Sequence, residues 1–320
     1  MARFLGLLIT SMKLKFRQLP VVGCLSFGLI CGASSAELFR VATYNLNNYL
    51  VAGSESRPAK SAESRHQIRT NLRALNADVL ALEEMGSPDD LAELRSSLQS
   101  EGLNYPHWEW VPGADTNIHV AELSRFPIVA RRPHTNESFL LYGRRFRVSR
   151  GFAEVDIKVS PNYSFTLMAA HLKSRRVSAK ADEAEIREQE AILLRERIDA
   201  YLQANPNANL IVLGDFNDTR DSAAIRSIRG HGKFTLVDTR PAERNGDDIR
   251  RSNSRTSPMT ITWTHYYALE DSYSRIDYIF LSSGMAREWN AIDTYVLAGA
   301  NWGLASDHRP ILATFWAENR

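Results

Sequence analysis

Cysteine is almost absent from this 320-residue sequence, because the only two, Cys24 and Cys31, lie within the first 36 residues. Disulfide bonds and thiolate metal sites are therefore excluded from residues 37–320. Glycine (17 residues) and proline (12 residues) are too few for a collagen-like or disordered chain. With 44% hydrophobic and 24% charged residues, the composition is that of a globular protein with a sizeable core.

The sequence also lacks an excess of charge of one sign. It has 39 basic and 37 acidic residues, and four of the basic ones but no acidic one precede Glu37. Residues 37–320 therefore carry a formal net charge of −2. This balance excludes a nucleic-acid binder that depends on overall positive charge.

The apolar run Leu19–Cys31 has 13 residues, fewer than the roughly 20 that a membrane-spanning helix needs. It follows a basic segment and precedes small residues that end at Ala36, an order typical of a secretory signal peptide. We predict a signal peptide over residues 1–36, cleaved before Glu37. The prediction implies export to the periplasm or the medium, with no membrane span after cleavage.

Two alternatives concern the same segment. A membrane anchor is disfavoured by the length of the apolar run. A lipoprotein modified at Cys24 is disfavoured because little apolar sequence separates the basic residues from that cysteine. The start of translation stays open between Met1 and Met12, since Met12 begins a better-proportioned signal.

Apolar runs with strand character alternate with helical patterns from Glu37 to the end of the chain. Ile68, Leu72 and Leu75 share one face of a helix, and Ser87-Pro88 is an N-terminal capping signal for another. A third amphipathic helix is predicted from Asp182 to Gln203. Such alternation predicts α/β layers in one domain over residues 37–320, with a polar surface loop at 241–258. The predicted strands are 39–46, 78–84, 152–159, 165–172, 209–216, 276–281 and 310–316.

Polar side chains interrupt these strands at their ends. Asp277 lies inside an apolar strand, where a carboxylate needs a partner such as an imidazole. Asn45 and Asn47 are two apart, which places them on one face of a regular strand. The full set at strand ends is Asn45, Asn47, Glu83, Glu84, His171, Asp215, Asn217, Asp277, Asp307 and His308.

This set of residue types is what a divalent-metal phosphoester hydrolase requires. Carboxylate and amide oxygens suit Mg²⁺ or Mn²⁺. A further carboxylate can orient or deprotonate water, and imidazoles can stabilise the negative charge that develops on the phosphate. The sequence contains no GxxxxGK[ST] and no GxSxG. P-loop nucleotide hydrolases and α/β-hydrolases are therefore excluded.

The motifs TYNLNNY, DVLALEEM, LSRFPI, HLKS, LGDFND, RIDYIF and SDHRP occur in an order that resembles the endonuclease/exonuclease/phosphatase superfamily, the deoxyribonuclease I-like hydrolases. The resemblance extends from about Phe39 to Trp316. It implies a four-layer α/β/β/α sandwich, in which two mixed β-sheets are flanked by helices and the site lies at one end. It also implies hydrolysis that depends on Mg²⁺ or Mn²⁺.

The resemblance assigns catalytic roles to five residues. Asp215 matches the residue that positions or deprotonates the attacking water, and Asn217 matches its orienting neighbour. His308 matches a catalytic histidine held by Asp277. His171 matches the histidine that donates to a phosphate oxygen.

The resemblance also implies the metal ligands and phosphate contacts. Asn45, Glu84 and Asp307 match the metal-binding positions. Asn47 stands where abasic-site repair members usually have an acidic residue. We expect it to contact the metal ligands rather than the metal directly, because an amide binds metal more weakly than a carboxylate. Relatives often have an arginine at the position of Arg150, and HLKSRR, which includes Lys173, is most similar to secreted bacterial members. We expect both side chains to contact substrate phosphate.

The first functional hypothesis is an exported phosphodiesterase that cleaves nucleic acid by in-line attack of water. The second keeps this chemistry but acts on phospholipid head groups or inositol phosphates. A third, an inactive extracellular binding module, is disfavoured because such a module has no need for an Asp277–His308 pair. No stable protein partner is implied. Histidines outside the motifs, His265 among them, receive no role.

Overall fold

Two β-sheets form the centre of the computed structural model, which describes residues 37–54, 56–176, 181–244 and 260–319. The chain divides into two units, residues 1–35 and 36–320. The predicted signal peptide and its cleavage site lie outside the described residues, so both stay predictions. The following description concerns the second unit.

Both sheets are mixed. One has seven strands in the order β12-β16-β17-β1-β2-β4-β3, and the other has six in the order β11-β15-β10-β9-β8-β5. The pairs β1–β2, β9–β10 and β12–β16 are parallel, and the other strand pairs are antiparallel. The first sheet comprises β1 (Leu38–Tyr49), β2 (Val79–Met85), β3 (His107–Val111), β4 (His119–Ser124), β12 (Ala242–Glu243), β16 (Trp289–Val296) and β17 (Ile311–Trp316). The second comprises β5 (Ile128–Arg131), β8 (Ala153–Ser160), β9 (Tyr163–Ala169), β10 (Leu210–Asp215), β11 (Val237–Asp238) and β15 (Asp277–Leu281).

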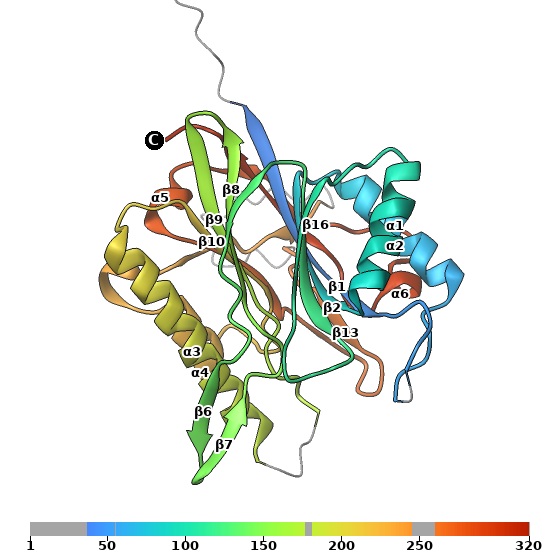
Figure 1. Cartoon of the computed structure of the whole chain (residues 1–320), viewed down its shortest axis with the longest axis horizontal. Helices are drawn as coiled ribbons and strands as arrows, with labels where there is room; N and C mark the ends of the chain where they lie inside the picture. Colours follow the sequence, from blue (N-terminus) through green and yellow to red (C-terminus); the bar gives the residue numbers. More distant parts are fainter. Residues whose placement is uncertain (1–36, 55, 177–180, 245–259, 320) are drawn as a thin grey trace, which may run out of the picture. The chain divides into compact units, whose positions relative to one another are not determined.

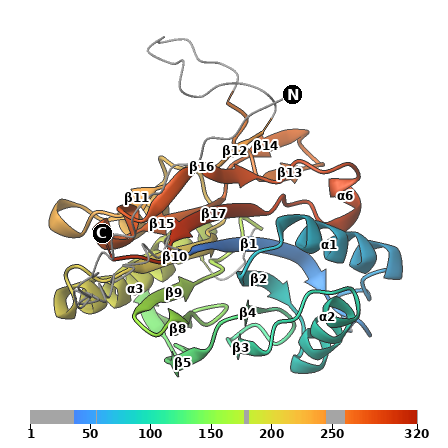
Figure 2. The ribbon, with the colours of Figure 1, turned by 90° about the horizontal axis from the view of Figure 1, so that it is seen from above.

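Helices cover the outer face of each sheet (Figures 1 and 2). The first sheet is covered by α1 (Ala62–Leu75), α2 (Pro88–Ser100) and α6 (Trp302–Ala305), and the second by α3 (Glu183–Ala204) and α4 (Ala223–Arg229). The short α5 (Ser283–Ala286) and a 3₁₀ turn (Gly232–Phe234) lie between later strands. The predicted four-layer sandwich is confirmed. None of the helices in the described ranges has the length and apolar character needed to span a bilayer.

Three apolar layers hold the sandwich together, because successive strand residues point to opposite faces. Phe39, Val41 and Ile211 are among the buried residues between the two sheets. Leu80 packs outward under α1 and α2, and Val212 packs under α3 and α4. Burial on both faces explains why these strands are almost continuously apolar in sequence.

The local helix signals act as expected. The Ser87 hydroxyl accepts from the Asp90 amide while Asp90 accepts from the Ser87 amide, which forms a capping box with Pro88 in the first turn. Asp182 caps α3 by accepting from the amides of Ala184 and Glu185, and the helix ends before Asn205. Because these signals depend on adjacent residues, α2 and α3 begin where the sequence predicts.

One prediction about β1 is wrong. Asn45 and Asn47 do not share a strand face, because the pairing with β2 shifts between Asn45 and Tyr49, and Asn47 and Asn48 have left-handed φ values of 48° and 60°. The Asn47 amide instead donates to Asn45 Oδ1 at 2.9 Å. The bulge turns the end of β1 toward the loop that follows it.

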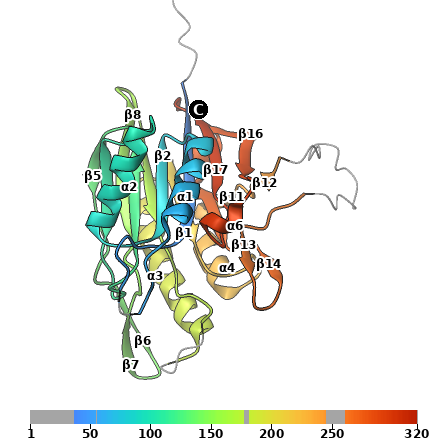
Figure 3. The same ribbon diagram turned by 90° about the vertical axis from the view of Figure 1, so that its right-hand side faces the viewer.

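Two hairpins project at the end of the sandwich where β1 and β10 finish (Figures 1 and 3). One is β6–β7 (Ser138–Leu141 and Arg144–Arg147), and the other is β13–β14 (His265–Tyr267 and Ser272–Ser274). Phe139 and Phe146 stack within the first hairpin, whose Arg145 and Arg147 lie together on one face. The second hairpin contacts one of the predicted polar residues, because His265 of β13 forms an isolated β-bridge with His308.

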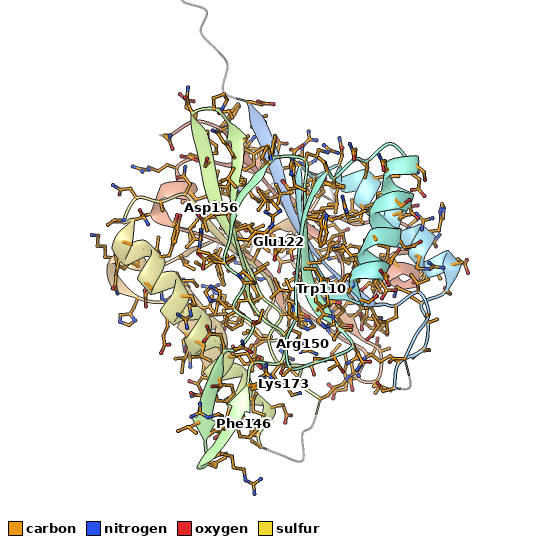
Figure 4. All side chains as sticks on the ribbon, viewed as in Figure 1. Trp110, Glu122, Phe146, Arg150, Asp156 and Lys173 are labelled. Carbon is orange, nitrogen blue, oxygen red and sulfur yellow. The ribbon has the colours of Figure 1, made fainter. Side chains whose placement is uncertain are left out.

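Glu122 is a buried carboxyl far from this end, in the middle of β4 (Figure 4). Neither of its oxygens has a hydrogen-bond partner, and burial together with Glu109 raises its pKa well above the usual range. The folded protein therefore holds Glu122 neutral, whereas the unfolded chain ionises it above its ordinary pKa. This difference lowers stability as the pH rises.

Glu122→Gln is expected to remove that pH-dependent cost. The melting temperature of the variant minus that of the wild type should increase from pH 4 to pH 8 by about 2 °C or more, since one pKa unit corresponds to about 1.4 kcal/mol. Thermal unfolding across this range, followed by circular dichroism, measures the difference. A difference that does not change with pH would show that Glu122 ionisation makes no contribution.

Candidate active site

Asp215 is the last residue of β10, and its carboxylate lies at the centre of a buried polar cluster. Oδ2 accepts from Asn45 Nδ2 at 2.9 Å and lies 3.4 Å from His171 Nε2 and 3.8 Å from His308 Nε2. Oδ1 accepts from the Asn217 amide at 2.8 Å. One carboxylate therefore joins residues from four separate segments of the chain.

The glycine before Asp215 is required by the close approach of two strands. Gly214 has a φ of 135°, and a Cβ at this position would collide with the carbonyl oxygen of Ala170. Leu172 donates its amide to the Asp215 carbonyl at 3.1 Å just beyond this point. The Gly-Asp pair thus brings the end of β10 against the segment that carries His171.

Asp277 and His308 form the predicted pair. His308 Nδ1 and Asp277 Oδ2 are 2.9 Å apart, and both side chains are buried. Asp277 is directly opposite Asp215 in the β10–β15 ladder. Burial opposes a charge on His308, but the Asp277 and Asp215 carboxylates outweigh it and raise the pKa of His308 well above its usual range. His308 is therefore a cation beside Asp215.

His171, on the opposite side of Asp215, is in the other charge state. Burial, followed by the positive charges of Arg150 and His308, lowers the pKa of His171 well below its usual range. Its Nδ1 has no hydrogen-bond partner. The Asp215 carboxylate thus lies between one charged and one neutral imidazole.

Asn217 fixes the orientation of Asp215. Its side-chain amide donates to the Leu172 carbonyl at 3.0 Å and to Asp215 Oδ2 at 3.3 Å. Its backbone has a left-handed φ of 53°, which an asparagine tolerates better than most residues. This conformation lets the amide and the side chain of one residue bind the same carboxylate.

The two consecutive glutamates at the end of β2 point to different places. Glu83 is fully buried between the sheets, accepts from Thr43 Oγ1 at 2.6 Å, and has its pKa raised well above the usual range by burial. Glu84 is half-buried with a left-handed φ of 58°, and its Oε2 accepts from the Asn48 amide at 2.9 Å. Glu84 stays the predicted metal ligand, while Glu83 lies close enough to Asp215, Asp277 and His308 to interact with them electrostatically.

Asp307 and His265 lie on the solvent side of His308. Asp307 is about half-exposed, and its Oδ2 is 3.8 Å from His265 Nε2. The His265 ring packs against the His308 ring with centroids 4.6 Å apart, and burial followed by the positive charge of His308 lowers the pKa of His265 to about 4. No motif assigned a role to His265, because its contact with His308 depends on an isolated β-bridge between distant segments.

The oxygen donors at this end suit a divalent cation. Burial lowers the pKa of the Lys60 ammonium to about 8. The negative charges of Asp307 and Glu84 oppose this shift, so both carboxylates lie near Lys60. Lys60 Nζ also donates to the Asn47 carbonyl at 2.7 Å. Among the described residues, groups of three carboxylate or imidazole ligands occur at His265, Asp307 and His308 and at Asp215, Asp277 and His308, and Glu84 belongs to neither. A cation held by Glu84, Asn45 and Asp307 would supply positive charge for a phosphate oxygen.

Two basic residues predicted to contact phosphate, Arg150 and Lys173, are labelled in Figure 4, and both lie close enough to His171 to lower its pKa. Arg150 is buried, donates to the Leu172 carbonyl at 3.2 Å, and has its Nη2 3.6 Å from Asp115 Oδ2. Its Nε has no partner. Lys173 is half-buried, and its Nζ donates to the carbonyls of Ser174 and Arg176.

The cluster can carry out hydrolysis of a phosphoester. A carboxylate with fixed geometry can accept a proton from water, while a cationic and a neutral imidazole on either side can donate to phosphate oxygens. Such a cluster, at the end of two facing mixed sheets, is expected of a metal-dependent phosphoester hydrolase. The chain belongs to the endonuclease/exonuclease/phosphatase family, whose sequence model matches residues 42–308. Members of this family are metal-dependent phosphoester hydrolases.

Solved structures share the fold at low sequence identity. The human Nocturnin catalytic domain has a TM-score of 0.60 and 16% identity, covering 88% of this chain and 97% of that one. Truncated TDP2 from Caenorhabditis elegans has a TM-score of 0.58 and 17% identity, covering 88% and 98%. Sphingomyelinase C from Streptomyces griseocarneus has a TM-score of 0.54 and 19% identity, covering 88% and 100%. A comparison with curated protein sequences gave no match.

Proposed function

We propose that this chain is an exported phosphodiesterase that depends on Mg²⁺ or Mn²⁺ and hydrolyses nucleic acid by in-line attack of water. One observation carries the proposal: the buried Asp215 carboxylate lies between a cationic and a neutral imidazole. Asp215 accepts the proton of the attacking water while Asn45 and Asn217 hold the carboxylate in place. His308 and His171 donate to phosphate oxygens as negative charge develops.

The substrate class rests on local charge. Residues 37–320 carry a net charge of −2, yet Arg57, Lys60, Arg150 and Lys173 all lie around this site. Four cations around the catalytic cluster can contact several phosphates at once, which favours a polyanionic substrate such as nucleic acid.

A second candidate substrate is a phospholipid head group or an inositol phosphate. It is favoured by apolar side chains on the two hairpins beside the site. Leu140 and Tyr142 are exposed on the β6–β7 hairpin, and Tyr267, Leu269 and Tyr273 are exposed on the β13–β14 hairpin. Exposed aromatic and apolar side chains of this kind suit the surface of a bilayer.

Incubation of residues 37–320 with plasmid, RNA, sphingomyelin vesicles and bis-p-nitrophenyl phosphate, with Mg²⁺ or with EDTA, tests the proposal. We expect hydrolysis of bis-p-nitrophenyl phosphate and of one or both nucleic acids, and none with EDTA. Hydrolysis of sphingomyelin alone would replace the nucleic-acid substrate by the lipid. Inertness toward all four substrates would contradict phosphodiesterase activity.

Removal of one metal ligand gives a separate prediction. Glu84→Gln keeps the shape of the side chain but removes its charge, so the Mg²⁺ or Mn²⁺ concentration for half-maximal activity is expected to rise by about 10-fold or more. Titration of activity with metal measures this concentration. Glu196→Gln, on the exposed side of α3, is the matched control. Activity that survives exhaustive EDTA treatment would contradict the metal assignment.

Export is tested by the N-terminus of the mature protein. Mass spectrometry of protein from the culture medium or periplasm is expected to find Glu37 as the first residue, because cleavage follows the small residues that end at Ala36. An uncleaved N-terminus on protein recovered from the cytoplasm would contradict the signal peptide.

A further inference from the structure

A cavity of about 680 Å³ adjoins the site on the side of Glu84. The end of β1 and the loop that follows it form a large part of its wall, and Asn47, Asn48, Arg57, Lys60, Asp115 and Arg176 are among the lining residues. The amide of Asn48, a lining residue, donates to Glu84, so the cavity is directly adjacent to this predicted metal ligand. A group bound in this cavity would lie next to the reacting phosphate.

The described wall of the cavity is cationic. Arg57, Lys60 and Arg176 contribute positive charge, and Asp115 contributes the one carboxylate. Asp115 Oδ2 lies 3.6 Å from Arg57 Nη2 and 3.6 Å from Arg150 Nη2. Both separations exceed a normal hydrogen-bond length, and a guanidinium has five donor hydrogens, so donors remain for a ligand.

Arg57 is held in position before any ligand binds. Its Nη1 donates to Asn48 Oδ1, and its side chain is only 22% exposed. Lys60 is fixed beside it by the bond from Nζ to the Asn47 carbonyl and by a backbone bond to Leu50. Arg57 also lies near enough to His171 to contribute to the lowering of the pKa of that imidazole. These cations therefore belong to a preformed surface beside the catalytic cluster.

We propose that this cavity is a second phosphate subsite, in which Arg57 and Lys60 bind the phosphate adjacent to the scissile one. The inference rests on the proposed phosphodiesterase function and narrows its substrate class. A substrate with consecutive phosphates, such as an oligonucleotide, fills the reaction site and the subsite together. A phospholipid with a single phosphate leaves the subsite empty.

Short thymidine nucleotides test the subsite. TpT has one phosphate, and pTpT and TpTp carry a second phosphate on either side of the same scissile bond. We expect kcat/KM to rise about 10-fold or more when a terminal phosphate is present on one of the two sides, as for a charge-assisted contact with arginine. Arg57→Gln is expected to bring the ratio of kcat/KM with the terminal phosphate to kcat/KM on TpT close to one. Arg57→Lys is expected to keep part of the increase.

Arg73→Gln is the matched control, because Arg73 is an exposed arginine on α1 that pairs with Glu101 at 3.9 Å. It should leave the ratio unchanged. Equal kcat/KM on TpT, pTpT and TpTp, with bis-p-nitrophenyl phosphate still hydrolysed, would overturn the subsite while preserving the phosphodiesterase. No hydrolysis of bis-p-nitrophenyl phosphate, plasmid, RNA or sphingomyelin would overturn the function itself. A wild-type ratio retained in a folded Arg57→Gln variant would also overturn the subsite.

Discussion

Replacing Asp215 with asparagine is expected to lower kcat about 1,000-fold, because the variant keeps the size of the side chain but cannot accept a proton from water. Burial, despite the positive charge of His308, raises the pKa of Asp215 to about 7. The wild-type rate should therefore increase as the pH rises through about 7 and the carboxyl ionises. The variant should lack this acidic limb. Both effects can be measured with bis-p-nitrophenyl phosphate from pH 5 to pH 9.

The control separates loss of the base from loss of the fold. Asp221→Asn makes the same substitution at an exposed residue soon after β10 and should leave kcat and the pH profile unchanged. The melting temperature of Asp215→Asn shows whether the variant is folded. A folded Asp215→Asn enzyme with more than about a tenth of wild-type kcat would contradict the role of general base.

Much of the fold is predictable because its signals are short-range. The run 209–216 predicts β10, which ends at Asp215, and Phe216 then packs against Tyr278 in the outer core. The helix expected over 182–203 is observed at Glu183–Ala204, since its N-cap Asp182 directly precedes it. Apolar runs and helix caps depend on residues that are neighbours in the chain, so these elements can be predicted from the sequence alone.

The bulge and the hairpins were not predictable for the opposite reason. The left-handed backbone at Asn47 and Asn48 exists because β1 shifts its pairing with β2, and that pairing joins residues 45 and 83, far apart in the chain. The β13–β14 hairpin lies in a polar stretch with little strand pattern. Its first residue, His265, pairs with His308 across the fold. No local pattern indicates such a contact.

The same distinction applies within the site. Asp277 is conspicuous in the sequence because a charged residue interrupts an apolar strand, and the structure places it 2.9 Å from His308. Arg57 has no such mark, because it stands in a polar loop where arginine is unremarkable. Its significance comes from Asp115 and Arg150, which approach it only in the folded chain. A charged residue inside an apolar strand can be recognised from the sequence, because its burial without a partner is costly. A surface formed by residues from distant segments can be recognised only once the fold is known.

His308→Ala is expected to lower kcat by about 100-fold or more, in line with a positioned acid–base group. The cost follows from the structure, since His308 is the cationic imidazole beside Asp215 and no other described imidazole bonds Asp277. His231→Ala, at an exposed histidine, is the control. A folded His308→Ala enzyme with wild-type kcat would exclude His308 from the reaction.

Asp277→Asn then tests how His308 acquires its charge. The carboxylate raises the pKa of His308, and the asparagine cannot, so the imidazolium of the variant loses its proton at lower pH. If the reaction needs that proton, the alkaline limb of the pH–rate profile should move to lower pH, and activity at neutral pH should fall substantially. A merely structural Asp277 would change the melting temperature and leave the limb in place. An unchanged rate and an unchanged limb would therefore show that the Asp277–His308 pair supports the fold and has no part in proton transfer.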